Sequence, residues 1–367
     1  MTQKKSQKRM SERLEEARKV LDPAQKSRLV RIYQALHGNI AFATLQNIYT
    51  VIAIVATYLG KDSIDNDEVF RNAYIIIAYM TTNSSIRFWG SHRKEAEQVV
   101  GEMRSISQVL EEWSTKAELD KLTKASNKAK LLADAYHLNA CTIIVFYAIN
   151  TSVTHTLSLS IPILPDTELV FWVLEVFEMI VLIVMLTANA AMLVYHLRVS
   201  ICMAGLLENI SEQFLSVKNV EHLNKLIEKH CHLCDTASRL RSLCSRWTVI
   251  QLSTLLLLLT GNTFNFIQGT KDFGSISAIP MALIFIYVFC VFGESIIVAS
   301  GRIGECAYRC NWLDAGADFR RKVVLVILRS QTPLCLDAGL IGDLSLATFE
   351  KIVKTWYKFL QALFSLM

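Results

Sequence analysis

Charged residues are scarce in this chain. They make up 19% of the 367 positions, whereas 52% of positions are hydrophobic and the mean hydropathy is +0.32. Soluble globular proteins carry about 25% charged residues, so this composition excludes an ordinary soluble domain. It predicts a polytopic membrane protein instead.

Motifs for catalysis and nucleotide binding are missing as well. The sequence contains no Gly-rich phosphate loop, no dinucleotide fingerprint, no Ser/His/Asp signature and no paired metal motif. We therefore expect no enzyme activity, no cofactor and no nucleic-acid partner.

Cysteine is absent from the loops that we assign below to the outer side of the membrane. The nine cysteines should therefore be reduced thiols without a disulfide framework. The run from His230 to Cys234 contains zinc-binding residue types, and on a helix its two ends share a face. His232 points away and no second cluster follows, so a buried helix face with incidental thiols is the better interpretation.

Long apolar runs, by contrast, are abundant. Five reach the length that crosses a lipid bilayer, at residues 40–59, 141–164, 179–197, 249–266 and 279–300. A weaker sixth run covers about residues 69–89, and the C-terminal stretch 345–367 is the seventh. The sequence thus predicts an all-α membrane protein with seven transmembrane helices.

The positions of the basic residues predict the orientation, because cytoplasmic loops retain Lys and Arg during insertion. Residues 1–37, 87–132, 197–246 and 301–332 together carry 32 of the 38 Lys and Arg residues, and the three loops between them carry 2. This places the N-terminus in the cytosol and the C-terminus outside, the reverse of the usual G-protein-coupled receptor.

Four parts follow from this topology. Residues 1–37 form a cytosolic tail, and residues 38–300 form a six-span membrane domain with helical cytosolic loops. Residues 301–344 form a cytosolic anchor segment, whose apolar run 323–328 is too short to span and should be an amphipathic helix. Residues 345–367 form the seventh helix.

The seventh helix carries a polar stripe on an otherwise apolar rod. Its members recur at offsets of three and four: Lys351, Lys354, Lys358, Gln361 and Ser365. Exposing such groups to lipid is costly, so the stripe must face protein or water. This favours a pore-lining helix, and the alternative is a helix lying flat on the membrane surface.

Two acidic residues, Glu175 and Glu178, precede the fourth predicted span. The run 179–197 is long enough to cross a bilayer alone. We therefore expect both carboxylates at the outer mouth of the membrane domain.

The chain from Phe289 onward resembles the insect odorant receptor family. The resemblance rests on Phe-Gly-Glu at 292–294, Ala-Tyr at 307–308 followed by Trp312, Gln-x-Pro at 331–333, Leu-Ser-Leu-x-Thr-Phe at 344–349 and a closing aromatic helix. It is specific over about the last 80 residues. Upstream the topology alone is similar, and the family's Leu-Gly-hydrophobic-Trp-Pro start is missing.

This resemblance implies a heteromer in the plasma membrane, in dendrites of olfactory sensory neurons. The chain would be the odorant-tuning subunit of a non-selective cation channel that also contains the family's co-receptor, four subunits surrounding one pore. The anchor between subunits would include Ser300, Gly304, Tyr308 and Trp312, because a small-xxx-small pair permits close helix approach. A gustatory-type homotetramer is the alternative, and a membrane scaffold without a gate is a more distant one.

The resemblance also implies two functional sites. The closing helix would line the pore with Lys358, Gln361, Ala362, Ser365 and Leu366. A small volatile odorant would bind in the outer half of the membrane domain, between spans two to four and the closing helix. Its candidate contacts are Tyr74, Tyr147, Asn150, Trp172, Phe177 and Tyr357, although aromatic residues are also common at membrane interfaces.

Lys358 departs from the family pattern, because a small polar residue usually occupies this position. It lies about 20 Å along the helix, near or beyond the middle of the membrane. We expect it to face water in the pore or to pack between subunits.

Overall fold

The computed structural model describes residues 66–113, 167–217, 219–267 and 273–366, with Val51 and a few isolated positions between 124 and 145. Apart from Val51 and Val145, the expected spans 40–59 and 141–164 lie outside these residues. The described chain forms helices α4 (Asn66–Trp113), α6 (Glu168–Ser216), α7 (Val220–Ile267), α8 (Phe273–Arg309), α9 (Ala317–Ser330) and α10 (Leu346–Leu366), with a 3₁₀ turn η1 (Gly339–Ile341).

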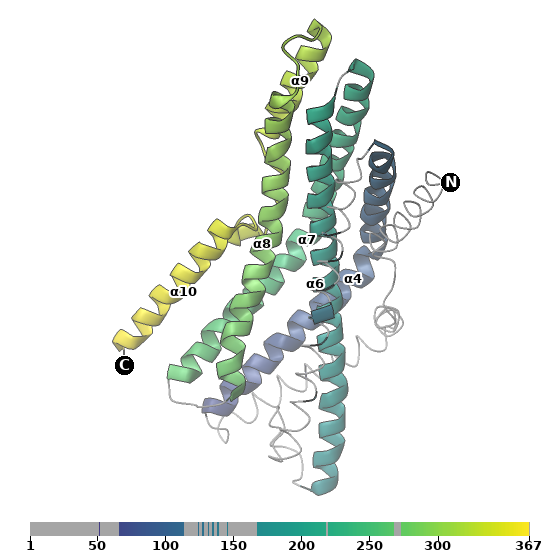
Figure 1. Ribbon diagram of the computed structural model, residues 1–367. Helices are drawn as coiled ribbons and strands as arrows, with labels where there is room; N and C mark the ends of the chain where they lie inside the picture. The colour runs from purple at the N-terminus through teal and green to yellow at the C-terminus, as the bar shows by residue number, and fades with distance from the viewer. Residues whose placement is uncertain are drawn as a thin grey trace, which may run out of the picture.

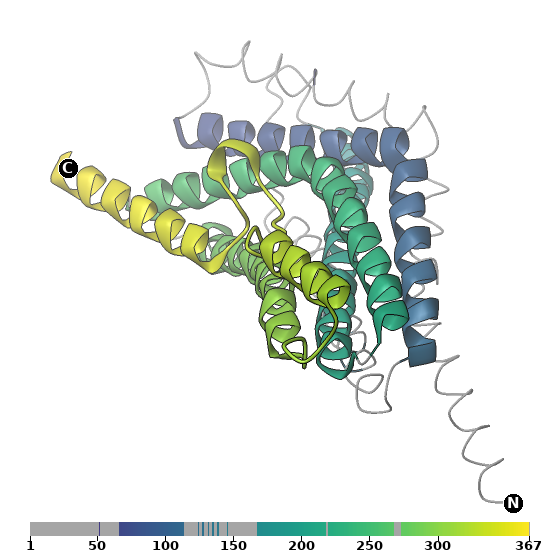
Figure 2. The same ribbon diagram turned by 90° about the horizontal axis from the view of Figure 1, so that it is seen from above.

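The long helices lie side by side, as Figure 1 shows. α6 packs along α8, α7 contacts both of them, and α4 covers α7 and α6. α9 folds back along the end of α8. Viewed from above, α10 points away from the other helices (Figure 2), and its described side chains after Leu360 are exposed.

Several helices are longer than a bilayer is thick. α4, α6 and α7 contain 48, 49 and 48 residues, which corresponds to about 72 Å at 1.5 Å per residue. The expected span 69–89 and the helical loop after it are therefore one helix, α4. Within the described ranges, three segments are long and apolar enough to span a membrane: Met192–Ser216, Val220–Thr263 and Ala282–Arg309.

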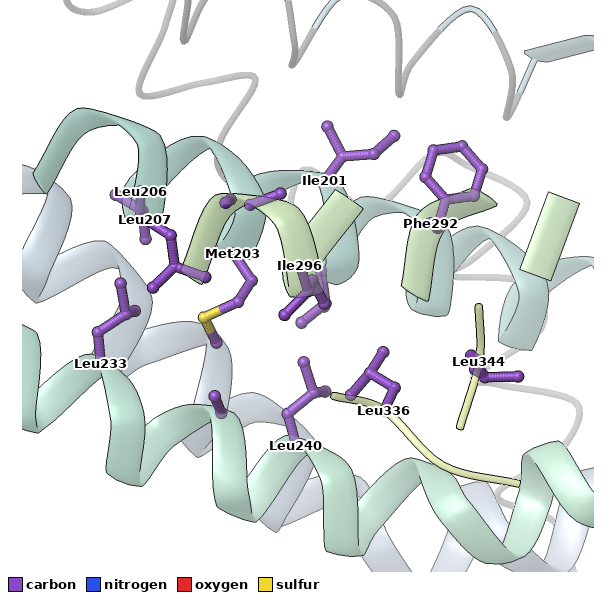
Figure 3. Close-up of a cluster of buried hydrophobic side chains, with 14 of the residues drawn as sticks. Ile201, Met203, Leu206, Leu207, Leu233, Leu240, Phe292, Ile296, Leu336 and Leu344 are labelled. Carbon is purple, nitrogen blue, oxygen red and sulfur yellow. The ribbon is translucent and has the colours of Figure 1, made fainter. Parts of the chain in front are cut away.

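The core lies where α6, α7 and α8 meet. Figure 3 shows part of it: Met203 and Leu207 of α6 face Leu233 of α7, and Ile296 of α8 lies beside them. Three aromatic rings also meet here, one from each helix. His196 lies 5.9 Å from Trp247 and 5.3 Å from Phe289.

Polar contacts fix α4 against its neighbours. Glu102 of α4 accepts hydrogen bonds from Thr236 at 3.1 Å and from Arg239 at 2.5 Å, both on α7. Gln213 of α6 donates to the carbonyl oxygen of Leu110 at 3.3 Å. Such directional contacts set the register between helices that apolar packing alone leaves free to slide.

Candidate functional site

α10 is held by one face and presents a polar stripe on the other. Phe349, Ile352 and Trp356 pack against the core, and the Phe349 ring lies 5.2 Å from that of Tyr287 on α8. At 3.6 residues per turn, the polar stripe defined above falls on the opposite side, and its five side chains are exposed: Lys351, Lys354, Lys358, Gln361 and Ser365. Ala362 is also exposed, and the side chain of Leu366 lies outside the described set.

The start of α10 is fixed against α8 at the Phe-Gly-Glu run. Leu344 crosses α8 directly over Gly293, where any added Cβ would collide with the carbonyl oxygen of Leu344. Glu294 then accepts a hydrogen bond from the backbone N–H of Leu346 at 3.1 Å. A carboxylate at this position satisfies an orphan donor and complements the positive end of the helix dipole.

The Leu-Ser-Leu-x-Thr-Phe run supplies the helix cap. The Ser345 hydroxyl accepts a hydrogen bond from the backbone N–H of Thr348 at 3.2 Å, as an N-cap serine does. The Thr348 hydroxyl donates to the carbonyl oxygen of Asp343 at 2.6 Å. The resemblance motifs at 292–294 and 344–349 therefore meet at one joint, which sets the direction of α10.

Residues 331–345, here called the linker, connect α9 to α10 and fold as a small hairpin. An isolated antiparallel bridge joins Asp337 to Asp343, and the N–H of Leu344 donates to the carbonyl oxygen of Leu336 at 2.7 Å. Gly339 and Gly342 form its tip with φ of 58° and 111°, values that favour glycine. Leu336 and Leu344 are buried in the core among α6, α7 and α8 (Figure 3).

A charged contact ties the linker to α7. Arg241 donates from Nε to Asp337 at 2.5 Å and lies 3.9 Å from Asp343, while the Ser245 hydroxyl donates to Asp337 at 2.5 Å. Partial burial alone would raise the pKa of Asp337, but the hydrogen bonds from Ser245 and Arg241 lower it below its usual value. Ser245 and Arg241 lie 92 and 96 positions from Asp337 in the sequence, so no local pattern marks them as its partners.

The proposed anchor residues occupy two different environments. Ser300 accepts a hydrogen bond from the N–H of Leu334 at 2.9 Å, and a Cβ on Gly304 would lie 2.9 Å from that of Ser330. Their close packing therefore occurs within the chain, between α8, α9 and the linker. Tyr308 is 65% exposed, and the ring N–H of Trp312 donates to its carbonyl oxygen at 2.9 Å. Tyr308 thus remains available to another subunit.

The proposed ligand contacts are only partly placed. Tyr147 and Asn150 lie outside the described residues, and Tyr74 lies on α4 with its side chain undescribed. Trp172 is 43% exposed and Phe177 is half-buried, both near the start of α6. Tyr357 is 57% exposed on α10, which points away from the bundle, so the structure does not bring it to the α6 pair.

The two glutamates lie within a helix that begins before them. α6 already begins at Glu168, so Glu175 and Glu178 lie two to three turns inside the helix, where they are 5% and 3% exposed. Both acids precede the spanning segment of α6, which begins at Met192, but residues 168–178 already belong to the same helix. Their place at the outer mouth stays a prediction.

The stretch from His230 to Cys234 behaves as a helix face. His230 and Cys234 are buried while Cys231 is exposed. Among the described residues, no group of three or more His, Cys, Asp or Glu side chains could hold a metal ion.

Taken together, the chain is a multi-pass helical membrane protein whose last helix packs on the core through one face and exposes its polar stripe within the described chain. Residues 65–357 match the family model described as "7tm Odorant receptor", which covers more than half of the chain. The chain belongs to this odorant receptor family.

Relatives from Drosophila melanogaster show the same relationship at low identity. Odorant receptor 85f is 21% identical over 187 residues, which cover 49% of this chain and 48% of that protein. Odorant receptor 67a is 35% identical over 77 residues, which cover 21% and 19% of the two chains. The matched part of the chain thus spans about half or less of these relatives.

Two solved structures share the fold over nearly the whole chain. The olfactory receptor OR5 from Machilis hrabei superposes with a TM-score of 0.79 at 11% identity, and covers 98% of this chain and 99% of that one. The same receptor in complex with eugenol superposes with a TM-score of 0.76 at 13% identity. The match covers 94% of this chain and 92% of that one. These likenesses establish the arrangement of the helices.

Proposed function

We propose that this chain is the odorant-binding subunit of a ligand-gated, non-selective cation channel, and that it acts with a co-receptor subunit in the plasma membrane of olfactory sensory neuron dendrites. It carries out no catalysis. The observation that carries the proposal is α10: a helix of 21 residues with an exposed polar face, directed away from its own bundle.

The geometry of α10 supports a pore. Its 21 residues extend about 32 Å, close to the thickness of a bilayer core. Lipid cannot accommodate three lysines on one helix face, so this face requires water or another subunit. A ring of such helices from four subunits satisfies the requirement, with Lys358, Gln361, Ala362, Ser365 and Leu366 towards the conduction path.

Family membership supports a small volatile ligand. The related receptor from Machilis hrabei was solved with eugenol. In this chain we place the ligand in the outer half of the membrane domain, with Trp172 and Phe177 as its aromatic contacts on α6. Tyr74, Tyr147 and Asn150 remain further candidate contacts. Tyr357, which this chain does not bring to the α6 pair, would join such a site from the closing helix of a neighbouring subunit.

Assembly would use the surfaces that the chain leaves uncovered at α8 and α9. Tyr308 is exposed there, and so are Leu325 and Leu328 on α9. Ser300 and Gly304 contribute by holding α9 and the linker close to α8, which shapes this surface.

Expression in a cell without endogenous odorant channels tests the proposal. The chain is expressed alone and with a co-receptor, and whole-cell current is recorded during application of a panel of volatile compounds. We expect odorant-evoked cation current only with the co-receptor. Robust current from the chain alone would reject the heteromer, and surface-expressed heteromers that respond to no volatile would reject the odorant-gated channel.

A further inference from the structure

Resting on the channel function proposed above, we propose that Arg241 of α7 is a positioning residue for α10: it holds the two carboxylates of the linker hairpin together and thereby couples movement of α7 to the pore helix.

The hairpin brings two like charges together. Asp337 and Asp343 face each other across the antiparallel bridge at its base. Directly paired like charges destabilise adjacent strands. Arg241 contacts both carboxylates, at 2.5 Å and 3.9 Å, and its single positive charge offsets one of the two negative charges.

The hairpin is short and leads straight into α10. Asp343 lies three residues before the helix begins. Its carbonyl oxygen accepts a hydrogen bond from the hydroxyl of Thr348, the residue whose backbone N–H is capped by Ser345. Displacing Asp343 therefore disturbs the cap. α7 and α10 are otherwise in limited contact, so the hairpin is the main polar connection between them in the described chain.

A second ion pair on α7 provides a matched control. Glu102 of α4 accepts from Arg239 at 2.5 Å and from the Thr236 hydroxyl, just as Asp337 accepts from Arg241 at 2.5 Å and from the Ser245 hydroxyl. The side-chain exposures of the two pairs are also similar. Arg239 and Glu102 are 48% and 17% exposed, and Arg241 and Asp337 are 46% and 21% exposed. The control pair ties α7 to α4 and does not touch the linker.

The first measurement is the odorant concentration that gives half-maximal current, for channels formed with the co-receptor. Arg241→Gln should raise it about fivefold, the scale of one ion pair, because a loosened hairpin transmits less of the movement of α7. Asp337→Asn should have a smaller effect. Adding Asp337→Asn to Arg241→Gln should bring the value back towards wild type, because one of the two repelling charges is gone.

The control variants Arg239→Gln and Glu102→Gln should leave the half-maximal concentration within about twofold of wild type. Equal shifts from the two arginine variants would overturn the proposal, and so would a double variant that is worse than Arg241→Gln alone. A fall in the half-maximal concentration would also overturn it, since that would mean that the contact opposes opening.

A second measurement does not depend on current. Cys335 lies in the linker, where burial and a hydrogen bond with Asp343 raise the pKa of its thiol and slow its alkylation. Arg241 itself lowers the pKa of this thiol, so Arg241→Gln removes that effect, whereas an opened hairpin exposes Cys335 and removes its hydrogen bond with Asp343. We expect the exposure to dominate, so that in the purified full-length chain N-ethylmaleimide labels Cys335 several-fold faster in Arg241→Gln. Peptide mass spectrometry measures the labelling. Exposed Cys231 on α7 is the internal reference and should react at an unchanged rate.

The two measurements separate two kinds of failure. If the wild-type heteromer passes no odorant current, the proposed function is wrong, and the labelling still tests whether Arg241 closes the hairpin. If current is present but neither labelling nor half-maximal concentration changes in Arg241→Gln, Arg241 does not position α10.

Discussion

At Gly293, α8 and the linker approach each other more closely than any residue with a side chain would allow. An added Cβ would overlap the backbone of Leu344, which lies at the base of α10. Gly293→Ala must therefore push the linker away from α8, and overpacking of this kind costs about 1–3 kcal/mol or more. We expect a lower thermal midpoint of the purified protein and reduced surface expression.

Gly301, eight residues further along α8, is the matched control. A Cβ there meets nothing within 4 Å, and alanine is a better helix former than glycine by about 1 kcal/mol. Gly301→Ala should leave the thermal midpoint unchanged or raise it slightly. If both variants changed the thermal midpoint equally, the close approach at Gly293 would not contribute measurably to stability.

Lys358 is the exposed charge furthest along α10. A fixed cation about 5 Å from the path of the ions repels a divalent ion twice as strongly as a monovalent one, by an extra 0.8 kcal/mol or so in water. Lys358→Ser should therefore raise the calcium-to-sodium permeability ratio by up to about fourfold. Odorant potency should change little.

Reversal potentials in calcium and in sodium solutions measure this ratio, and Lys358→Arg is the control that keeps the charge. Equal ratios for wild type, Lys358→Ser and Lys358→Arg would place Lys358 outside the conduction path. It would then pack between subunits.

At the scale of the element, the stability that the linker hairpin contributes should decrease at acidic pH. Asp337 has a lowered pKa in the folded chain, so its contribution to stability is present above the pKa of the unfolded chain, about 3.9. This contribution is lost as the pH falls through the lower folded pKa. The difference in thermal midpoint between wild type and Asp337→Asn should therefore be constant from about pH 5 to 8 and shrink below about pH 4.

Thermal unfolding of wild type and Asp337→Asn at several pH values from below about 4 up to about 8 checks the direction of this pH dependence. Arg241, Ser245, Asp343 and the thiol of Cys335 are the groups that face Asp337, and none of them has an unperturbed pKa between about 5 and 8. A difference that grows on acidification would contradict the assignment.

The elements differ in how well sequence predicts them. The helix expected at 345–367 is α10, because its period is regular and Ser345 marks the start. The short run 323–328 lies in α9, which confirms the helix predicted from its amphipathic pattern. The helical loop expected after the span 69–89 is confirmed as part of α4, but the sequence did not show that span and loop form one unbroken helix or that α6 begins at Glu168. Hydropathy marks where a helix enters water and does not mark where the helix ends.

The contacts of the candidate site were harder to predict for a physical reason. Arg241 and Asp337 are ordinary polar residues in their local sequence, and only the folded chain brings them together. Glu175 and Glu178 show a similar limit. The length of the run 179–197 predicts that they precede the span, but only the folded chain shows that both side chains are buried within α6.

At the scale of the whole molecule, α9 has apolar residues on two sides. Phe319, Val323 and Val326 are buried against the chain, while Leu325 and Leu328 remain exposed on another side. Exposed apolar residues in such a cluster indicate a protein contact, and burying one leucine side chain contributes about 1.5–3 kcal/mol. Leu325→Gln with Leu328→Gln should therefore weaken assembly with the co-receptor.

Native electrophoresis of detergent-solubilised complexes measures the assembly. We expect the double variant to shift most complexes to smaller species while its thermal midpoint stays close to wild type, since neither side chain is buried within the chain. Leu215→Gln with Val220→Gln removes two exposed apolar side chains where α6 meets α7, and it should leave assembly intact. Loss of assembly in both double variants would indicate general destabilisation. Loss in neither would mean that the subunits meet elsewhere, and Tyr308 would then be the next exposed residue to change.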